Sequence, residues 1–548
     1  MSAMRNHFQQ WMNSGSPWVW FTAGAVSLSL VMVFGLLGLI AGNGLGHFWP
    51  SRLALVELEG EPPVLMLGEL ADHETVAASR VREGGGTVPE GATVVKRLLL
   101  KRGNRDLNEQ DFVWINAPSI KRLEYPTDVV AIERREWGNL YGRIKGLTEN
   151  DQPVPVTELP ARLDRALALR EDIDHLEKEE IGAVNYQIER LRLREKAARK
   201  RGIAEAELEA MVAEKAALEE SYQALATKLQ TLNAEIGRDK LLFETITGEQ
   251  RPVAFSNVVR VYAPNQLSSG EKAAHYLRKL REFIAEQPRE ANTEGGVYPA
   301  IFGTVLLVVI MSVFVTPLGV IAAVYLREYA KPGPVTSAIR IAVNNLAGVP
   351  SVVYGVFGFG FFVYLVGGSL DQAFFADALP SPTLGTPGLL WSALTLTLLT
   401  VPVVIVATEE GLTRIPRAIR EGSLALGATK AETLWRTVLP MATPAMMTGL
   451  ILAVARAAGE VAPLMMVGVV KLAPALPLDG NFPYLHLERK FMHLGFHIYD
   501  VGFQSPNVEA ARPLVYSTAL LLVFIIMSLN LAAIRLRNRL REKYNAAE

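Results

Sequence analysis

The stretch EGSLALGATKAETLWRTVLP, residues 421–440, is a polar and amphipathic segment that lies between two long apolar ones. The run at 389–408 before it contains no charged residue, and the chain is again mainly apolar from 442 to about 470. Apolar runs of about 20 residues cross a bilayer as helices. The stretch is therefore predicted to be a loop between two membrane-spanning helices.

Basic residues gather in and around this loop: Arg414, Arg417, Arg420, Lys430 and Arg436. Loops with such an excess of Lys and Arg face the cytoplasm, the compartment that holds ATP. Five small or apolar residues at three- and four-residue spacing predict one stripe of a single helix: Leu424, Gly427, Ala428, Ala431 and Leu434. The Leu439-Pro440 pair is predicted to end that helix. Since the stripe has no membrane to enter, we expect another protein to receive it.

The segment resembles the EAA loop of bacterial ABC-importer permeases, whose spacing is matched by four residues: Glu421, Gly427, Leu439 and Pro440. The resemblance implies that a helix here couples the chain to a separate ATPase subunit by docking into a groove on it. The segment departs from the family pattern at Gly422, Ser423 and Thr437. An ordinary amphipathic linker between membrane helices is the alternative.

The composition of the 548 residues, half of which are hydrophobic (50%), indicates a membrane protein with a sizeable soluble part. The net charge of −1 argues against a nucleic-acid-binding protein, and the absence of cysteine excludes disulfides and thiolate metal sites. Six spans are predicted, at about 18–41, 298–326, 347–367, 389–408, 443–470 and 514–534. The first is too long for a typical signal peptide, so we expect an uncleaved anchor.

These spans divide the chain into a cytoplasmic N-terminus with the first helix at 1–45, an insert at 46–295, and a transmembrane domain at 296–548. The cytoplasmic loop of that domain extends over 409–441. The basic residues of the short loops and the C-terminal tail predict that both termini are cytoplasmic. The same reasoning puts the insert on the periplasmic side of a bacterial inner membrane.

The insert begins with alternating segments typical of strands, at 53–60, 93–101, 111–118 and 129–144. Two later segments, 241–246 and 252–264, predict returning strands, and 266–288 predicts an amphipathic helix. Between them, 158–240 is rich in Ala, Glu, Leu, Lys and Arg and predicts a long antiparallel coiled-coil hairpin with its tip near Gly202. The expected insert is a soluble α+β domain: a small antiparallel sheet or barrel interrupted by this hairpin. The pattern is compatible with three roles of the hairpin: its arms pack only on each other, they form an intermolecular coiled coil, or they contact a partner protein.

The sequence contains no GxxxxGK[ST] motif, so no loop of this chain is predicted to hold ATP phosphates. The chain is therefore expected not to be an enzyme and to bind no cofactor directly, with ATP and magnesium used by partner subunits. His493 and His497 stand four residues apart, but no third ligand lies near them in the sequence, so no metal site is assigned.

Arg456 and Glu460 lie one helical turn apart inside the fifth predicted span. A charged side chain in an apolar span costs about 3 kcal/mol or more, so each is expected to pair with the other or to face a polar pathway. The guanidinium fork suits phosphate-like oxyanions. Both residues are predicted to line the translocation pathway, and a structural ion pair between helices is the alternative.

The pattern RAxGExAPL resembles the PstA family of phosphate-uptake permeases through six residues: Arg456, Gly459, Glu460, Ala462, Pro463 and Leu464. The run NNLAGVPSVVYGVFGFG at 344–360 belongs to the same resemblance, which covers the first span and about 296–548. It implies a six-helix type I ABC-importer permease fold and an ATP-driven phosphate importer. The implied partners are a PstC-like permease, a PstB-like ATPase dimer and a periplasmic phosphate-binding protein.

Two departures from the family pattern leave other functions open. Val461 stands where the family usually has Thr, and ordinary members lack the insert. One alternative is a permease for another oxyanion, molybdate or sulfate. A second is a membrane scaffold or phosphate sensor that acts through the external hairpin.

Overall fold

The computed structural model describes residues 11, 14–60, 63–108, 110–202, 205–505 and 508–545. Six helical spans in these ranges are long and apolar enough to cross a membrane: Trp18–Gly46, Tyr298–Tyr329, Ser351–Phe374, Leu389–Arg414, Lys430–Gly459 and Ala511–Arg539. The prediction of six apolar spanning helices is thereby confirmed. Residues 1–10, which belong to the predicted cytoplasmic N-terminus, lie outside the described residues.

The spans are built from these main helices: α2 (Ser16–Gly46), α9 (Tyr298–Val324), α11 (Ser351–Phe357), α12 (Gly368–Phe374), α13 (Leu389–Arg414), α16 (Leu439–Gly459) and α19 (Val508–Asn545). π-Helical segments extend or join them: η6 (Tyr325–Tyr329), η7 (Gly358–Gly367) and η8 (Leu434–Val438). Shorter elements complete this part: α10 (Pro334–Leu346), α14 (Arg417–Ala425), α15 (Lys430–Thr433), α17 (Leu464–Val467), α18 (Leu494–Tyr499) and η9 (Asp500–Gln504). We call the helices from α9 to α19 the helical half.

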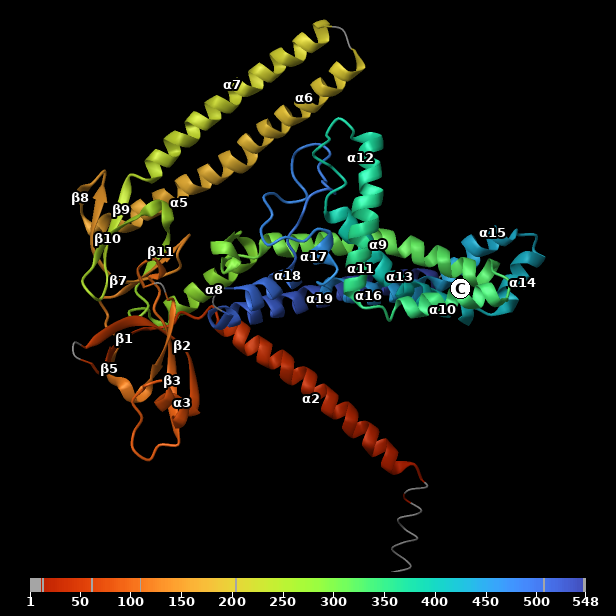
Figure 1. Cartoon of the computed structure of the whole chain (residues 1–548). Helices are drawn as coiled ribbons and strands as arrows, with labels where there is room; N and C mark the ends of the chain where they lie inside the picture. Colours follow the sequence, from red (N-terminus) through yellow and green to blue (C-terminus); the bar gives the residue numbers. More distant parts are fainter. Residues whose placement is uncertain are drawn as a thin grey trace, which may run out of the picture.

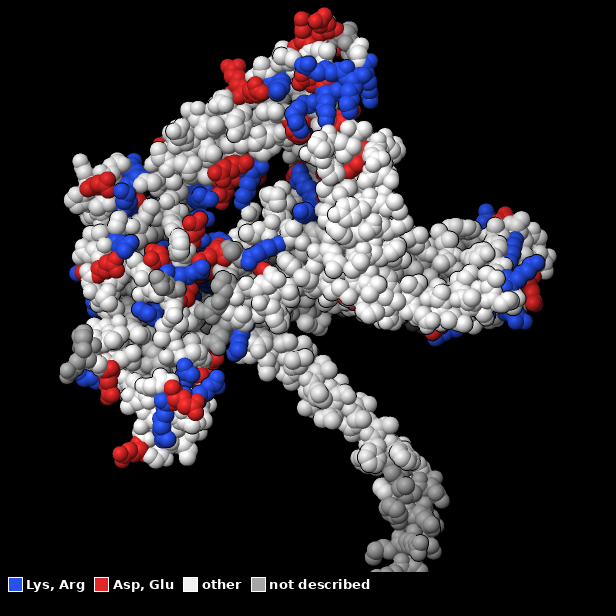
Figure 2. Space-filling model, viewed as in Figure 1, with Lys and Arg blue, Asp and Glu red and all other residues white. Residues whose placement is uncertain are grey.

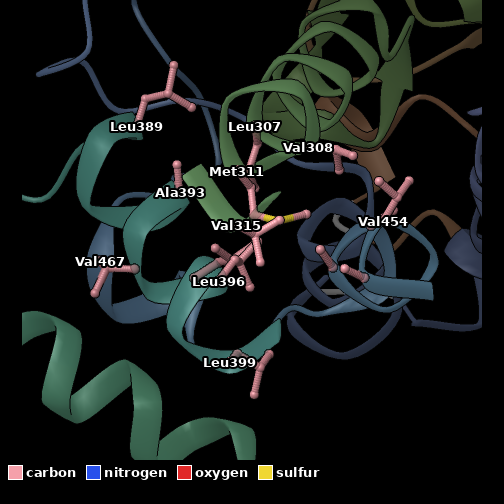
Figure 3. Packing of buried hydrophobic residues seen from close by; sticks show 14 of the residues in the cluster. Leu307, Val308, Met311, Val315, Leu389, Ala393, Leu396, Leu399, Val454 and Val467 are labelled. Atoms are coloured by element: carbon pink, nitrogen blue, oxygen red, sulfur yellow. The ribbon is translucent and has the colours of Figure 1, made fainter. Parts of the chain in front are cut away.

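The helix α13 is the centre of the helical half. It packs against α9 and α16, and α16 packs in turn against α19 (Figure 1). Its most apolar window is 67% buried, whereas that of α2 is 0% buried. Figure 3 shows Met311 and Val315 of α9 beside Leu396 of α13 in the largest apolar cluster. Three buried threonines of α13 each donate to a carbonyl four residues earlier, which satisfies the hydroxyl without water: Thr395, Thr397 and Thr400.

Two antiparallel sheets lie between α2 and α9 in the chain. The first has the order β4-β3-β2-β1-β5 and contains β1 (Leu53–Leu58), β2 (Val64–Ala77), β3 (Val94–Lys101), β4 (Phe112–Asn116) and β5 (Ile120–Glu124). The second has the order β10-β9-β7-β6-β11, with β8 beside β7. Its strands are β6 (Val130–Arg134), β7 (Leu140–Glu149), β8 (Gln152–Val154), β9 (Asp239–Glu244), β10 (Gln250–Ala254) and β11 (Val258–Tyr262). The short helix α3 (Ala78–Glu83) packs against β2 and β3 of the first sheet, and Asp106 of α4 (Arg105–Asn108) pairs with Arg134 of β6 in the second.

Two long helical arms emerge from the second sheet. The first arm consists of α5 (Leu159–His175), the π-helical η3 (Leu176–Ile181) and α6 (Gly182–Arg201), and the second is α7 (Glu205–Ile236). α6 and α7 run side by side, and α7, with 32 residues, is about 48 Å long (Figure 1). Gly202 caps α6 with φ +69°, and the tip residues 203–204 lie outside the described residues. Half-buried residues follow α7 at three- and four-residue spacing: Met211, Lys215, Leu218, Tyr222, Leu225, Leu229 and Leu232.

The helix α8 (Ser269–Ala285) fastens the sheets to the helical half. A capping box between Ser268 and Glu271 begins it. Its far end joins an apolar cluster with the starts of α9 and α19, whose members include Phe48, Phe283, Val297, Ala300, Met492 and Leu514. On its other face Lys279 pairs with the buried Glu133 of β6, to which Arg260 also lies close at 3.3 Å. Burial raises the pKa of Glu133, but the two cations outweigh it and hold that pKa at about 2.

Candidate functional site

The segment 415–440 folds as two helices joined by a tight turn. α14 ends at Ala425, and Gly427 follows with φ +88°, a left-handed conformation that favours glycine. α15 then begins at a capping box, in which Thr429 accepts from the Glu432 N–H while the Glu432 carboxylate accepts from the Thr429 N–H. The predicted single helical stripe is therefore wrong, because Gly427 interrupts the helical repeat in its middle.

Pro440 does not end a helix as predicted. It lies in the first turn of α16, directly after the π-helical η8. Proline has no N–H to donate to the preceding turn, and a wider π-helical turn accommodates that missing bond. α15, η8 and α16 form one continuous run from Lys430 to Gly459, which is the fifth span.

The turn is braced against the ends of two other spans. Arg420 of α14 donates through Nη2 to the Glu328 carboxylate of η6 at 2.9 Å. The same guanidinium donates to the carbonyls of Leu412 and Ile415 at the end of α13. An apolar cluster lies behind these bonds: Leu412, Ile415, Leu434, Val438 and Ala442. α14 is therefore joined by hydrogen bonds and apolar packing to the spans that end beside it.

Of the four predicted coupling residues, two lie at the surface of this turn. Glu421 and Gly427 are exposed, whereas Leu439 and Pro440 are half-buried in the helical run. Two large apolar side chains that the sequence analysis did not single out are strongly exposed beside them: Leu426 at 91% and Trp435 at 75%. Figure 2 shows this end of the molecule, at the right, with charged side chains around uncharged ones. Such an exposed apolar surface with a charged rim is typical of a protein-binding site.

Arg456 lies in the last turn of α16, and Glu460 follows the helix end at Gly459. The predicted fifth span, 443–470, is thus too long: Glu460 has extended backbone with ψ 130° and is outside the helix. The Nε of Arg456 is 3.7 Å from Oε1 of Glu460, too far for a hydrogen bond. The two side chains are 34% and 22% exposed. Within the described residues, Glu460 is the only charged partner of Arg456, so its N–H groups remain available.

The chain after Glu460 is held by close backbone packing. A Cβ on Gly355 of α11 would lie 2.8 Å from the Cα of Pro463, so only glycine allows this approach. Val467 of α17 accepts a hydrogen bond from the N–H of Gly388, which precedes α13. The turn that carries Glu460 is therefore connected to two other spans.

One helical run connects the two predicted sites. It begins with Lys430 beside the turn at Gly427 and ends with Arg456 and Gly459, a length of about 45 Å for its 30 residues. The two predicted sites therefore lie near opposite ends of the same helical span.

Within the described residues, no group of three or more His, Cys, Asp or Glu side chains could hold a metal ion. His493 and His497 are both buried. His493 caps α18, because its Nδ1 accepts from the N–H of Gly495 at 3.1 Å. The role of His493 is therefore that of a helix cap.

The bracing partner of Arg420 and the apolar surface of the turn are not among the features predicted from the sequence. Glu328 lies 92 residues before Arg420, and no local pattern joins them. The capping box at Thr429 could have been found, since Thr-x-x-Glu marks a helix start and would have divided the stripe.

The six apolar helices of the described residues are those of a multi-pass membrane protein. Residues 315–545 match the family described as "Binding-protein-dependent transport system inner membrane component".

Two similar proteins identify the kind of transport system more closely. The phosphate transport system permease protein PstA 1 of Mycobacterium tuberculosis (strain CDC 1551 / Oshkosh) is 36% identical over 270 residues, 48% of this chain and 77% of the relative. The phosphate transport system permease protein PstA of Mycobacterium leprae (strain TN) is 36% identical over 239 residues, 43% of this chain and 69% of the relative. The chain belongs to the PstA family of these transport-system permeases.

Among solved structures, inward-facing MetNI methionine ABC transporter resembles this chain at 19% identity and a TM-score of 0.31. The match covers 45% of this chain and 94% of the other. A bacterial ABC transporter that imports the acidic polysaccharide alginate matches at 14% identity and a TM-score of 0.32, over 44% of this chain and 78% of the other.

Proposed function

We propose that this chain is the permease subunit of an ATP-driven phosphate importer. It forms the translocation pathway with a second, PstC-like permease and rests on two PstB-like ATPase subunits that use ATP and magnesium. A periplasmic phosphate-binding protein delivers the substrate. Family membership supports this assignment, because the two mycobacterial relatives are named for phosphate transport.

The observation that carries the substrate assignment is the state of Arg456. Its guanidinium has five N–H donors in a planar fork, which fits the oxygens of a tetrahedral oxyanion. The one neighbouring carboxylate lies at 3.7 Å and does not form a hydrogen bond with it. An arriving phosphate thus finds free donors, and a small movement of Glu460 toward Arg456 competes for the same donors. The pair can therefore bind and release an anion as the spans move.

The turn at Gly427 is proposed to be the ATPase-coupling element. Glu421 and Gly427 are exposed there, and Leu426 extends almost wholly into solvent. Leu439 and Pro440 act one step later, where the loop becomes the span. Docking of the turn in an ATPase groove moves α14, and Arg420 carries that movement to Glu328.

The rest of the topology follows from this assignment. The turn and both termini are cytoplasmic, and the insert at 46–295 is a soluble periplasmic domain whose arms form a coiled-coil hairpin. The basic residues at the turn support this orientation.

The assignment is tested with two variants of the assembled complex: Arg456→Ala and Arg456→Lys. We expect Arg456→Ala to abolish phosphate uptake while the subunits still co-purify. Arg456→Lys keeps the charge but not the fork, so we expect reduced uptake and normal assembly. A complex that fails to assemble with Arg456→Ala but assembles with Arg456→Lys would instead show a structural ion pair.

A further inference from the structure

The first hairpin arm touches the helical half at two places that are far apart in the sequence. Segment 375–388 connects α12 to α13, and segment 468–493 connects α17 to α18. In Figure 1, α6 passes above α12 and above the neighbouring blue segment. Hydrogen bonds join α6 to both segments. An ion pair also joins it to segment 375–388, and ring contacts join it to segment 468–493.

Segment 375–388 is held by two lysines near the end of α6. Lys200 Nζ pairs with Asp377 Oδ1 at 2.8 Å, and Lys196 Nζ donates to the carbonyl of Leu379 at 2.7 Å. The hydrogen bond from Lys200 lowers the pKa of the Asp377 carboxyl below its ordinary value. This end of α6 is strongly basic, with Arg190, Arg192, Arg194, Lys196, Arg199, Lys200 and Arg201. Segment 375–388 has no basic residue, so the two are electrostatically complementary.

Segment 468–493 is held by aromatic contacts about four helical turns away from the tip. The hydroxyl of Tyr186 donates to the carbonyl of Phe482, and the ring of Tyr186 meets that of His486 edge-on at 5.9 Å. The guanidinium of Arg190 lies over the Phe482 ring at 5.7 Å. His486 is itself held between Asp479 and Glu488 at 3.0 and 3.1 Å, which fixes the ring that α6 contacts.

The contact of Lys200 with Asp377 is of a kind that can open and close. Lys200 and Asp377 are 53% and 33% exposed, and an exposed ion pair contributes about 0–1 kcal/mol. No hydrophobic cluster of the described residues joins α6 to either segment. The root of the insert is different, because Phe283 of α8 and Ala300 of α9 share an apolar cluster. The arm therefore has a firmly packed base and a weakly held end. Figure 2 shows an opening beneath the arm between these points.

The two segments lead directly to the spans that carry the proposed pathway. Their bases meet at the start of α13 through three backbone hydrogen bonds: Gly388 to Val467, Leu389 to Arg489 and Leu390 to Leu487. Segment 375–388 is also fixed to α12, because Asp371 accepts from the N–H groups of Leu384 and Gly385. Val467 belongs to α17, which follows Glu460. If the tips of these segments are held in place, the turn after Arg456 is therefore held as well, because the segments are bonded to α17 and to the start of α13.

We propose that α6 is a strap that ties the tips of segments 375–388 and 468–493 together and releases one of them during each transport cycle. The proposal rests on the proposed function, because alternating access requires the spans that carry these segments to move relative to each other. The exposed pair of Lys200 and Asp377 permits release of segment 375–388, whereas an apolar interface would not.

The experiment uses the natural absence of cysteine. Lys200→Cys and Asp377→Cys are introduced together in the full-length chain, and the assembled complex is treated with a short bifunctional thiosulfonate. Locking the strap is expected to reduce ATP-driven phosphate uptake by about tenfold or more, with recovery after reduction. Glu180→Cys with Lys228→Cys is the matched control, because these residues join the two arms to each other at 3.9 Å and leave the strap free. We expect that control cross-link to leave uptake unchanged.

A second readout does not depend on the transported ion. The rate at which the 200–377 pair cross-links is compared in nucleotide-free and in vanadate-trapped complex, and a difference of about threefold or more is expected. If the wild-type complex does not take up phosphate, the proposed function fails while this rate still tests the strap. Equal cross-linking rates, or unchanged uptake with the strap locked, would overturn the strap.

Discussion

Arg420 on α14 donates to the carboxylate of Glu328 on η6 at 2.9 Å, across 92 residues of sequence. Both side chains are largely covered, at 17% and 12% exposure. The bond makes the turn at Gly427 and the end of the second span one mechanical unit. Any subunit that pushes on α14 therefore acts on α9 as well as on α16.

Removal of this bond is predicted to separate ATP hydrolysis from transport. Arg420→Ala leaves Glu328 partly buried without its cation, at a cost of about 1–3 kcal/mol. We expect ATP hydrolysis by the assembled complex to continue while uptake falls. Arg417→Ala, on the same helix and exposed, is the matched control and should affect neither the melting temperature nor the coupling ratio. Equal ratios of transport to hydrolysis in the two variants would refute the bracing role of Arg420.

Gly427 is predicted to be required for coupling and not for insertion into the membrane. Its φ is +88°, and a Cβ there would meet nothing within 4 Å in this chain. Gly427→Asp is therefore expected to fold and insert normally but to block uptake, because the new carboxylate enters the surface that receives the ATPase. Gly427→Asn has the same size without the charge and tolerates this backbone conformation, so it should retain more uptake. Normal uptake by the aspartate variant would contradict the coupling assignment.

Leu426 is predicted to contribute to subunit binding alone. It is 91% exposed, so Leu426→Ser removes little packing within the chain. We expect unchanged thermal stability and a weaker hold on the ATPase subunits in co-purification. The comparison variant is Leu434→Ser, at a residue only 4% exposed, where loss of packing costs about 3 kcal/mol. Stable ATPase association with Leu426→Ser would show that this side chain is outside the interface.

The sequence predicted the number of spans and the location of the loop well, because both follow from hydropathy and charge. It predicted the interior of the loop poorly. A three- and four-residue spacing from Leu424 to Leu434 is compatible with one helix, whereas the left-handed backbone at Gly427 and the capping box at Thr429 divide it into two. Pro440 predicted the end of a helix, but the π-helical η8 before it accommodates the proline and the helical run continues.

The surroundings of Arg456 and Glu460 were also predicted only in part from the sequence. Apolar residues continue to 470, so hydropathy extended the fifth span beyond its end at Gly459. Pro463 follows that end by four residues and lies close to Gly355, a contact between distant segments. Long-range pairs such as Arg420 with Glu328, or Lys200 with Asp377, leave no periodic pattern in the sequence.

The buried carboxylate of Glu133 is predicted to anchor the second sheet to α8. Lys279 and Arg260 hold its pKa at about 2, below the ordinary value of 4.5, despite burial. Because the folded pKa is lowered, the stabilisation is fully present above about pH 4.5 and is lost as the pH falls toward 2. Glu133→Gln leaves two cations without their partner and is expected to cost about 3–5 kcal/mol.

Amide hydrogen exchange of the full-length protein checks this anchor. The variant should exchange faster in β6 and α8 at neutral pH, with the helical spans unaffected. Glu136→Gln, an exposed neighbour on the following turn, is the control. Unchanged protection of β6 and α8 in the Glu133 variant would show that the ion cluster contributes nothing to the attachment.

The most direct test of the account is transport by the complete complex in proteoliposomes, with the full-length chain, its second permease, the ATPase subunits and the binding protein. Labelled phosphate, sulfate and molybdate are offered separately, with and without ATP on the side of the ATPase subunits. We expect ATP-dependent accumulation of phosphate and of neither sulfate nor molybdate, and we expect Arg456→Ala to abolish it. Accumulation of sulfate or molybdate in place of phosphate, or no ATP-dependent transport by the assembled complex, would contradict it.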